Sequence, residues 1–263
     1  MNRLYHELNA VIAVAARDVI RYLRVPGGII LSFLWPLILL GLLGGSLAQN
    51  LGGSSNFNLS QFILYGVVVM MLYQGTMGNV ISLIVDRQNN FTQSMFVAPI
   101  SRYAIILGKI IGGTITSLFS VVGVFVIGFL MQIPFTLTDV GYMLILAPMI
   151  CIAGGALGIL FISLVSDPQQ ATQVGTLVML PQMFLAGLLI PVSQSSGILG
   201  VLSHLMPMTY LADLMRNMVF AEHPAYSQIV LYSPVVDLGI TIVVAVLFIV
   251  AGTVMFARSE RTR

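Results

Sequence analysis

The chain has 263 residues, of which 58% are hydrophobic and only 8% are charged. A soluble domain typically has about 45–50% apolar and about 25% charged residues, so this composition excludes a surface that faces water throughout. The formal net charge is +2, without the basic clusters that bind nucleic acid, so nucleic-acid binding is not expected. Cys151 is the only cysteine, which excludes an intramolecular disulfide and a cysteine-based metal site.

Long stretches of the chain contain no charged residue and no histidine, namely 25–85, 110–138, 140–166 and 238–257. A run of about 18 or more apolar residues is long enough to cross the hydrocarbon core of a bilayer as a helix. We therefore predict an all-α, multi-pass membrane protein with one transmembrane domain, 1–263. Apolar windows and their flanking residues predict six spans, at 27–48, 60–84, 104–130, 140–165, 170–190 and 237–257.

The first cytoplasmic segment, 1–26, has the pattern of an amphipathic helix that lies on the membrane surface. At 100° per residue, apolar side chains between Leu4 and Tyr22 fall within an arc of about 80°. The arginines on the opposite side include Arg17, Arg21 and Arg24. An apolar stripe opposed by arginines is typical of an interfacial helix. A helix that packs on a soluble partner is the alternative, and both readings can hold together.

Polar motifs between the spans predict where helices begin and end. Residues 50–58, NLGGSSNFN, have the composition of a loop. Ser101 can cap the third span. Between the fourth and fifth spans, Asp167 can cap a helix whose first residue is Pro168, with Gln170 placed as in a capping box.

The segment 191–236 is too long and too apolar for an ordinary loop. It contains apolar runs at Ile198–Leu205 and 210–220, each too short to cross a bilayer and separated by Pro207. We predict an outer re-entrant helical hairpin before the last span.

The basic residues predict the orientation of the chain. Nine of the eleven lysines and arginines lie in the segments 1–26, 85–103 and 258–263. Lys109 lies about two turns into the third span, and Arg216 lies in the segment before the last span. Because cytoplasmic loops carry an excess of basic residues, both termini, including the tail 258–263, are predicted to be cytoplasmic.

The spans lack the groups that intramembrane catalysis or ion coupling would require. Four aspartates lie at span ends, and Lys109 is expected to extend its ammonium group toward the cytoplasmic surface. We therefore predict no catalytic residue and no metal site. The phosphate-binding pattern G-x-x-x-x-G-K-[ST] is also absent, so the energy for any active transport must come from another polypeptide.

The cytoplasmic segment after the second span is suited to docking a partner. Phe91 and Met95 lie four residues apart, on one face of a short helix that Pro99 ends. An exposed apolar pair surrounded by amides fits a groove on another protein, and a helix resting on lipid is the alternative. The candidate coupling residues are Arg87, Gln88, Asn90, Phe91, Met95, Pro99 and Arg102.

The same segment resembles a known family. The run from Asp86 to Lys109, with VAPISR at 97–102 and LGK at 107–109, is similar to the first cytoplasmic loop of type-2 ATP-binding-cassette (ABC) transporter permeases. The stretch before the last span, with Pro207, Tyr210 and Arg216 as candidate hairpin residues, resembles that family as well.

The resemblance implies a permease subunit that moves substrate outward through a bacterial or archaeal cytoplasmic membrane. It implies a dimer of permeases, with a homodimer favoured over a heterodimer, and two copies of an ABC ATPase. ATP and Mg would then be bound by the ATPase, and this chain would hold no cofactor.

Polar and methionine side chains on the second and fifth spans predict a substrate path between protomers, although hydrogen bonding between helices is the alternative. Such a path favours an amphipathic drug-like or lipid-like substrate, as in multidrug efflux. A polysaccharide or glycolipid exporter and a membrane scaffold that transports nothing are the competing interpretations. The candidate path residues are Tyr65, Met70, Tyr73, Gln74, Gln173, Thr176, Met179 and Met183.

Overall fold

The computed structural model describes residues 2–46, 57–88, 101–165, 167–191 and 197–261. Every regular element within these residues is a helix, so the all-α prediction is confirmed. The elements are α1 (Asn2–Arg24), α2 (Pro26–Leu37), the π-helix η1 (Ile38–Gly44), α4 (Leu59–Gln88), α6 (Arg102–Leu130), α7 (Leu137–Leu164), α8 (Pro168–Leu185), α9 (Ile198–Leu205), α10 (Pro207–Val219), α11 (Tyr226–Ile229) and α12 (Pro234–Arg261).

Long apolar helices dominate the architecture. Four candidate spans, in α4, α6, α7 and the region of α12, are long and apolar enough to cross a bilayer. A fifth is possible if α1 and α2 form one broken span, although these two helices meet at a bend of 80°. The predicted span 170–190 corresponds to α8, which is not among the qualifying helices. Glutamines and threonines in its first half lower its hydropathy, so a count of six spans is not confirmed.

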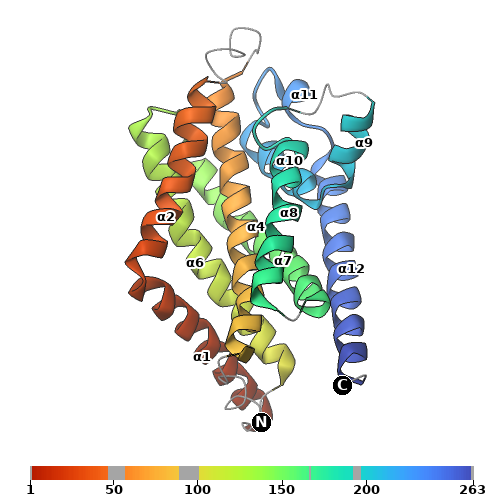
Figure 1. Ribbon diagram of the computed structural model, residues 1–263. Helices are drawn as coiled ribbons and strands as arrows, with labels where there is room; N and C mark the ends of the chain where they lie inside the picture. The colour runs from red at the N-terminus through yellow and green to blue at the C-terminus, as the bar shows by residue number, and fades with distance from the viewer. Residues whose placement is uncertain (1, 47–56, 89–100, 166, 192–196, 262–263) are drawn as a thin grey trace.

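The bend between α1 and α2 follows from Pro26, the first residue of α2. A residue before proline is disfavoured in the α conformation, and Val25 accordingly has φ −110° and ψ 83°, which ends α1. Helix α1 then runs obliquely along α6 at the end of the molecule that also holds the last turn of α12 (Figure 1).

The predicted amphipathic helix exists, and it packs on its own chain. Gly108 on α6 leaves room for Val14, since a Cβ at Gly108 would lie 2.7 Å from the Val14 Cβ. The apolar side of α1 is therefore divided between a strip buried against α6 and a second exposed strip. The exposed strip consists of Tyr5, Leu8, Ile12 and Leu23. Its position at a membrane surface remains a prediction.

Helix α4 lies in the centre of the bundle, between α6 and α7 (Figure 1). Close packing with α7 depends on Gly154, where a Cβ would lie only 2.2 Å from the Tyr73 carbonyl oxygen. Gly158, four residues further along α7, approaches Met77 and Val80 in the same way. This small-xxx-small spacing allows the two backbones to approach closely.

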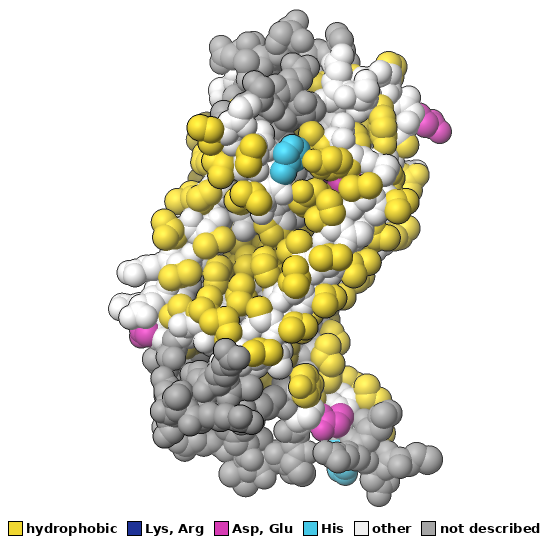
Figure 2. Space-filling model, turned by 90° about the vertical axis from the view of Figure 1, so that its right-hand side faces the viewer, with side chains coloured by type: hydrophobic (Ala, Val, Ile, Leu, Met, Phe, Trp, Pro, Cys, Tyr) yellow, Lys and Arg dark blue, Asp and Glu magenta, His cyan; other side chains and the backbone are white. Residues whose placement is uncertain are grey.

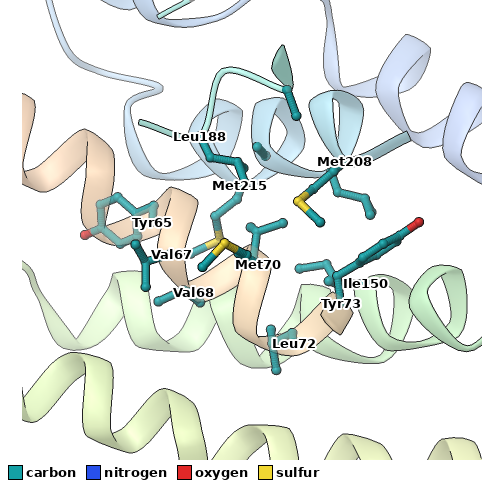
Figure 3. Close-up of a cluster of buried hydrophobic side chains, with 14 of the residues drawn as sticks. Tyr65, Val67, Val68, Met70, Leu72, Tyr73, Ile150, Leu188, Met208 and Met215 are labelled. Atoms are coloured by element: carbon teal, nitrogen blue, oxygen red, sulfur yellow. The ribbon is translucent and has the colours of Figure 1, made fainter. Parts of the chain in front are cut away.

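At the opposite end, α9 and α10 occupy the two short apolar runs expected from the sequence, with Pro207 as the first residue of α10. Residues 208–217 of α10 are all buried, against α4, α7 and α12. Figure 3 shows Met208 and Met215 of α10 directed toward α4. The two helices are thus part of the packed body, and their insertion as a re-entrant hairpin remains a prediction.

The surface of the bundle is largely apolar. On the side of α9 and α12, apolar side chains cover most of the described middle of the face (Figure 2). Helix α12 contributes many of them, and only 17% of its most apolar window is buried. Such a surface is suited to lipid or to another membrane subunit.

Candidate functional site

A buried cluster of charges joins α1, α4 and α6 near the N-terminal end. The Lys109 side chain is 1% exposed, and its Nζ lies 2.7 Å from Oδ2 of Asp86 and 3.1 Å from Oδ2 of Asp18. It also donates to Ser82 Oγ at 2.8 Å. The Lys109 side chain extends from the level of Asn79 toward the end of α4 that carries Asp86, the direction expected from the sequence. Its ammonium group does not reach the surface, because two carboxylates from neighbouring helices provide its counter-charges within the bundle.

The arginines of α1 complete this cluster. Arg17 Nη2 lies 2.7 Å from Oδ1 of Asp18 and 2.5 Å from Oδ2 of Asp86. Arg21 Nη1 lies 3.4 Å from Oδ1 of Asp86, whereas Arg24 is exposed. Two of the three candidate interfacial arginines, Arg17 and Arg21, therefore bind Asp86 near the end of α4. The sequence did not predict this contact, because Asp86 lies more than sixty positions from either arginine.

Asp86 and Ser101 flank the candidate coupling segment, and both bond to α1. Ser101 caps α6 as predicted, accepting from the Ala104 backbone N–H at 3.2 Å. Its own backbone N–H and hydroxyl donate to the Glu7 carboxylate, at 3.2 and 2.5 Å. Asn90, Phe91, Met95 and Pro99 lie outside the described residues, as do the side chains of Arg87, Gln88 and Arg102.

One pocket, of about 380 Å³, lies between α2, α4 and α8. It brings together four of the eight candidate path residues and joins them with Trp35 and Gly78. The pocket is mainly apolar, with a few polar groups on the walls contributed by α4 and α8. The four path residues are Gln74, Thr176, Met179 and Met183.

The other four candidate path residues lie elsewhere. Tyr65 is buried, and its hydroxyl donates to Oδ2 of Asp139 at 2.7 Å. Met70 and Tyr73 are buried in the core around α4 (Figure 3). Gln173 is exposed on α8. The structure therefore separates Tyr65, Met70 and Tyr73 of α4 from the pocket that α8 lines.

A second pocket, of about 420 Å³, lies between α1, α2, α4 and α6. Its lining is more polar and includes Asp18, Arg21, Asn79, Ser82, Ser117 and Ser120. Sequence reasoning missed this pocket, although Thr116, Ser117 and Ser120 mark one polar face of an otherwise apolar span. Gly78 lines both pockets.

At the opposite end, Arg216 is 2% exposed. Its Nη2 donates to the carbonyl oxygens of Gly187 and Leu188, at 2.7 and 3.3 Å, just beyond the last turn of α8. The guanidinium carbon also lies 3.5 Å from the centroid of the Phe62 ring. Burial lowers the pKa of Arg216 to about 9, which leaves it charged at neutral pH. Arg216 thus bonds carbonyl groups at the end of a helix, and the effect of these bonds on transport is a prediction.

The neighbouring polar residues fix the connection to α12. The Asp213 carboxylate accepts from the backbone N–H groups of Leu231 and Tyr232, at 2.9 and 2.8 Å. Asn217 donates to Asp237 Oδ2 at 2.9 Å. The predicted hairpin residue Tyr210 donates its hydroxyl to the His204 carbonyl at 2.6 Å. The spacing of Asp213 and Asn217 on one helix face was a signal that sequence reasoning overlooked.

Comparison with known proteins places this arrangement in a family. A family model described as ABC-2 type transporter matches residues 9–220, a range that includes α4 to α10 and most of α1. The chain is also similar to a protein named "Putative transport permease ycf38" from Cyanophora paradoxa, with 24% identity over 246 residues. That alignment covers 90% of this chain and 83% of the relative.

Proposed function

Since the chain belongs to the ABC-2 type transporter family, we propose that it is the permease subunit of an ATP-driven exporter. Two copies form a homodimer on two ATPase subunits, which bind ATP and Mg. Both termini face the cytoplasm of a bacterial or archaeal cell, and α8, paired with a second protomer, completes six crossings of the cytoplasmic membrane.

The observation that carries the proposal is the attachment of both flanks of the coupling segment to α1. Asp86 bonds to Arg17 and Arg21, and Ser101 bonds to Glu7. Movement of an ATPase docked at the coupling residues between Arg87 and Arg102 would therefore be transmitted to α1, and from α1 to α2 across the bend at Val25 and Pro26. Helix α2 forms one wall of both pockets, so the same movement would alter the space available to a substrate.

The pocket between α2, α4 and α8 is the proposed translocation path. Its volume of about 380 Å³ lies in the range of small-molecule sites. Methionine side chains adapt to ligands of different shape, and Met77, Met179 and Met183 line this space. An amphipathic drug-like or lipid-like substrate fits this lining better than a highly charged polymer. A polysaccharide or glycolipid exporter is the alternative, and a scaffold without transport would have no use for the pocket.

A pull-down with the cognate ATPase tests the coupling role. In Phe91→Ser/Met95→Ser, each replaced side chain loses roughly 1.5–3 kcal/mol of burial in a partner groove, before association costs. We expect the permease to retain normal expression and insertion and to bind the ATPase orders of magnitude more weakly.

The matched control is Ile198→Ser/Val201→Ser, which removes an exposed apolar pair from α9 at the opposite end of the molecule. This variant should hold the ATPase as the wild type does. Retention of the ATPase at wild-type affinity by the Phe91/Met95 variant would contradict the proposal, and so would equal losses in both variants.

A further inference from the structure

We infer that the pocket between α1, α2, α4 and α6 binds the anionic headgroup of an amphiphile whose apolar part occupies the pocket beside α8. This inference extends the proposed function by naming a headgroup site and its chemistry. It uses the proposed function only to identify the α8 pocket as part of the path.

The charge of the polar pocket favours an anion. Asp18 is engaged by Lys109, by Arg17 and by the side-chain amide of Asn79. The Arg21 side chain, by contrast, is 57% exposed and makes a long contact of 3.4 Å with Asp86. A guanidinium has five N–H donors, so Arg21 can bind a phosphate, carboxylate or sulfate while it keeps that contact. The five described charges of the cluster are three cations and two carboxylates, which leaves one positive charge beside the pocket.

The hydroxyl groups of the pocket favour a headgroup that carries donors. Ser117 Oγ donates to the Gly113 carbonyl, and Ser82 Oγ donates to the Asn79 carbonyl, both within their own helices. Each hydroxyl hydrogen is thus used locally. Ser82 Oγ already accepts from Lys109, which leaves it one lone pair, and Ser117 Oγ can also accept. A headgroup that combines an anionic group with hydroxyls, as glycerol phosphate does, would satisfy Arg21 and these acceptors together.

The two pockets both reach Gly78. A Cβ added at Gly78 would find no atom within 4 Å, so the space in front of this residue is open. On one side lie the charged and hydroxyl groups just described. On the other side lie Trp35, Met77, Ile81, Met179 and Leu180. A polar compartment of about 420 Å³ that shares Gly78 with an apolar one of about 380 Å³ matches a ligand with a polar head and an apolar body.

Trp35 provides a direct measurement of binding. It is the only tryptophan in the chain and lines the apolar compartment. The probe is phosphatidylglycerol with dibrominated acyl chains, titrated into the full-length permease in detergent micelles, because bromine quenches tryptophan fluorescence at short range. We expect saturable quenching, and about tenfold weaker binding of phosphatidylcholine with the same brominated chains, because its cationic choline is repelled by Arg21 and its headgroup has no hydroxyl donor.

Substitution of Arg21 tests the headgroup contact. Arg21→Gln should bind the two lipids with equal affinity, and Arg21→Lys, which keeps the charge, should restore most of the preference. Equal affinity of the wild type for both lipids would overturn the inference. A preference that persists in Arg21→Gln would overturn it as well.

Substitution of Gly78 tests the connection between the compartments. Gly78→Leu should fill the shared space and abolish saturable quenching, while the open surroundings of Gly78 allow the chain to fold. Gly239→Leu on α12 is the matched control, since an added Cβ there also finds no atom within 4 Å. Wild-type quenching in a folded Gly78→Leu variant would show that the pockets do not act as one site.

The anionic amphiphile can be an exported substrate or a resident phospholipid. In the complex with the cognate ATPase, ATP should release the quenching if the lipid is cargo and leave it unchanged if the lipid is resident. Because the titration uses the permease alone, loss of ATPase binding would contradict the proposed function without affecting this result.

Discussion

The two ends of the bundle both bury cations, but they satisfy them differently. Near the N-terminal end, the carboxylates of Asp18 on α1 and Asp86 on α4 neutralise both Lys109 and Arg17. At the opposite end, Arg216 bonds to backbone carbonyls and lies over the Phe62 ring.

This difference separates a part of the molecule that can rearrange from a part that holds its geometry. Side-chain charges on three helices can exchange partners when the helices shift, because each carboxylate there meets more than one cation. Carbonyls at a helix end are fixed by the backbone, so the bonds of Arg216 hold α10 against the end of α8. We therefore expect conformational change to concentrate at the α1 end.

The largest effect is expected from Lys109→Met. This substitution leaves Asp18 and Asp86 buried with less compensation, and breaking a buried ion pair by removing one partner typically costs about 3–5 kcal/mol. The thermal midpoint of the detergent-solubilised protein should fall strongly.

A second variant separates charge from packing. Adding Asp18→Asn and Asp86→Asn to Lys109→Met removes the carboxylates that Lys109 no longer neutralises. This should recover part of the lost stability, since Arg17 and Arg21, which lose their partners, are both partly exposed to solvent. If the single and triple variants are equally unstable, the cluster stabilises the bundle through packing. That result would contradict the difference proposed between the two ends of the bundle.

A smaller loss, of about 2–3 kcal/mol, is expected from Arg216→Ala, because the substitution removes charged hydrogen bonds to the carbonyls of Gly187 and Leu188. Export should be impaired while membrane insertion stays intact, as measured by transport in vesicles and by protease accessibility. Arg216→Lys should recover little, since a lysine cannot bond both carbonyls with one planar group. Wild-type transport in Arg216→Ala would show that the outer end does not need this anchor.

Much of the fold could be predicted because local rules specify it. Pro26, Ser101, Asp167 and Pro207 end or begin helices through backbone chemistry that depends only on near neighbours. Helix α8, predicted as a span at 170–190, does not qualify as one by hydropathy, because glutamines and threonines in its first half make it less apolar than the other long helices.

The site was less predictable because its parts come from distant positions. Lys109 meets Asp18 across 91 positions, and no local pattern shows which carboxylate will neutralise a charge in a span. Gln74 and Thr176, two polar residues of apolar helices, both line the pocket beside α8. Tyr65 and Tyr73 have the same polarity but turn into the core, and only the rotation of α4 in the bundle decides between these outcomes.

The smallest effect is expected from Glu7→Gln. This substitution tests whether the bond from α1 to Ser101, at the C-terminal end of the coupling segment, contributes to coupling. The amide oxygen can still accept from Ser101, but a neutral acceptor is roughly half as strong as a carboxylate, so stability should change by less than about 1 kcal/mol. Coupling should respond more clearly, with export by the assembled transporter reduced about threefold at an unchanged amount of bound ATPase.

A double-mutant cycle with Ser101→Ala isolates this contact. Ser101→Ala also removes the cap of α6, so it will reduce stability by itself. If the two side chains act through their mutual bond, the double variant should be less impaired than the sum of the single variants, by no more than the cost of Glu7→Gln alone, which is below about 1 kcal/mol. Strictly additive effects on export would mean that Glu7 and Ser101 contribute separately, and the attachment of α1 would then rest on Asp86 alone.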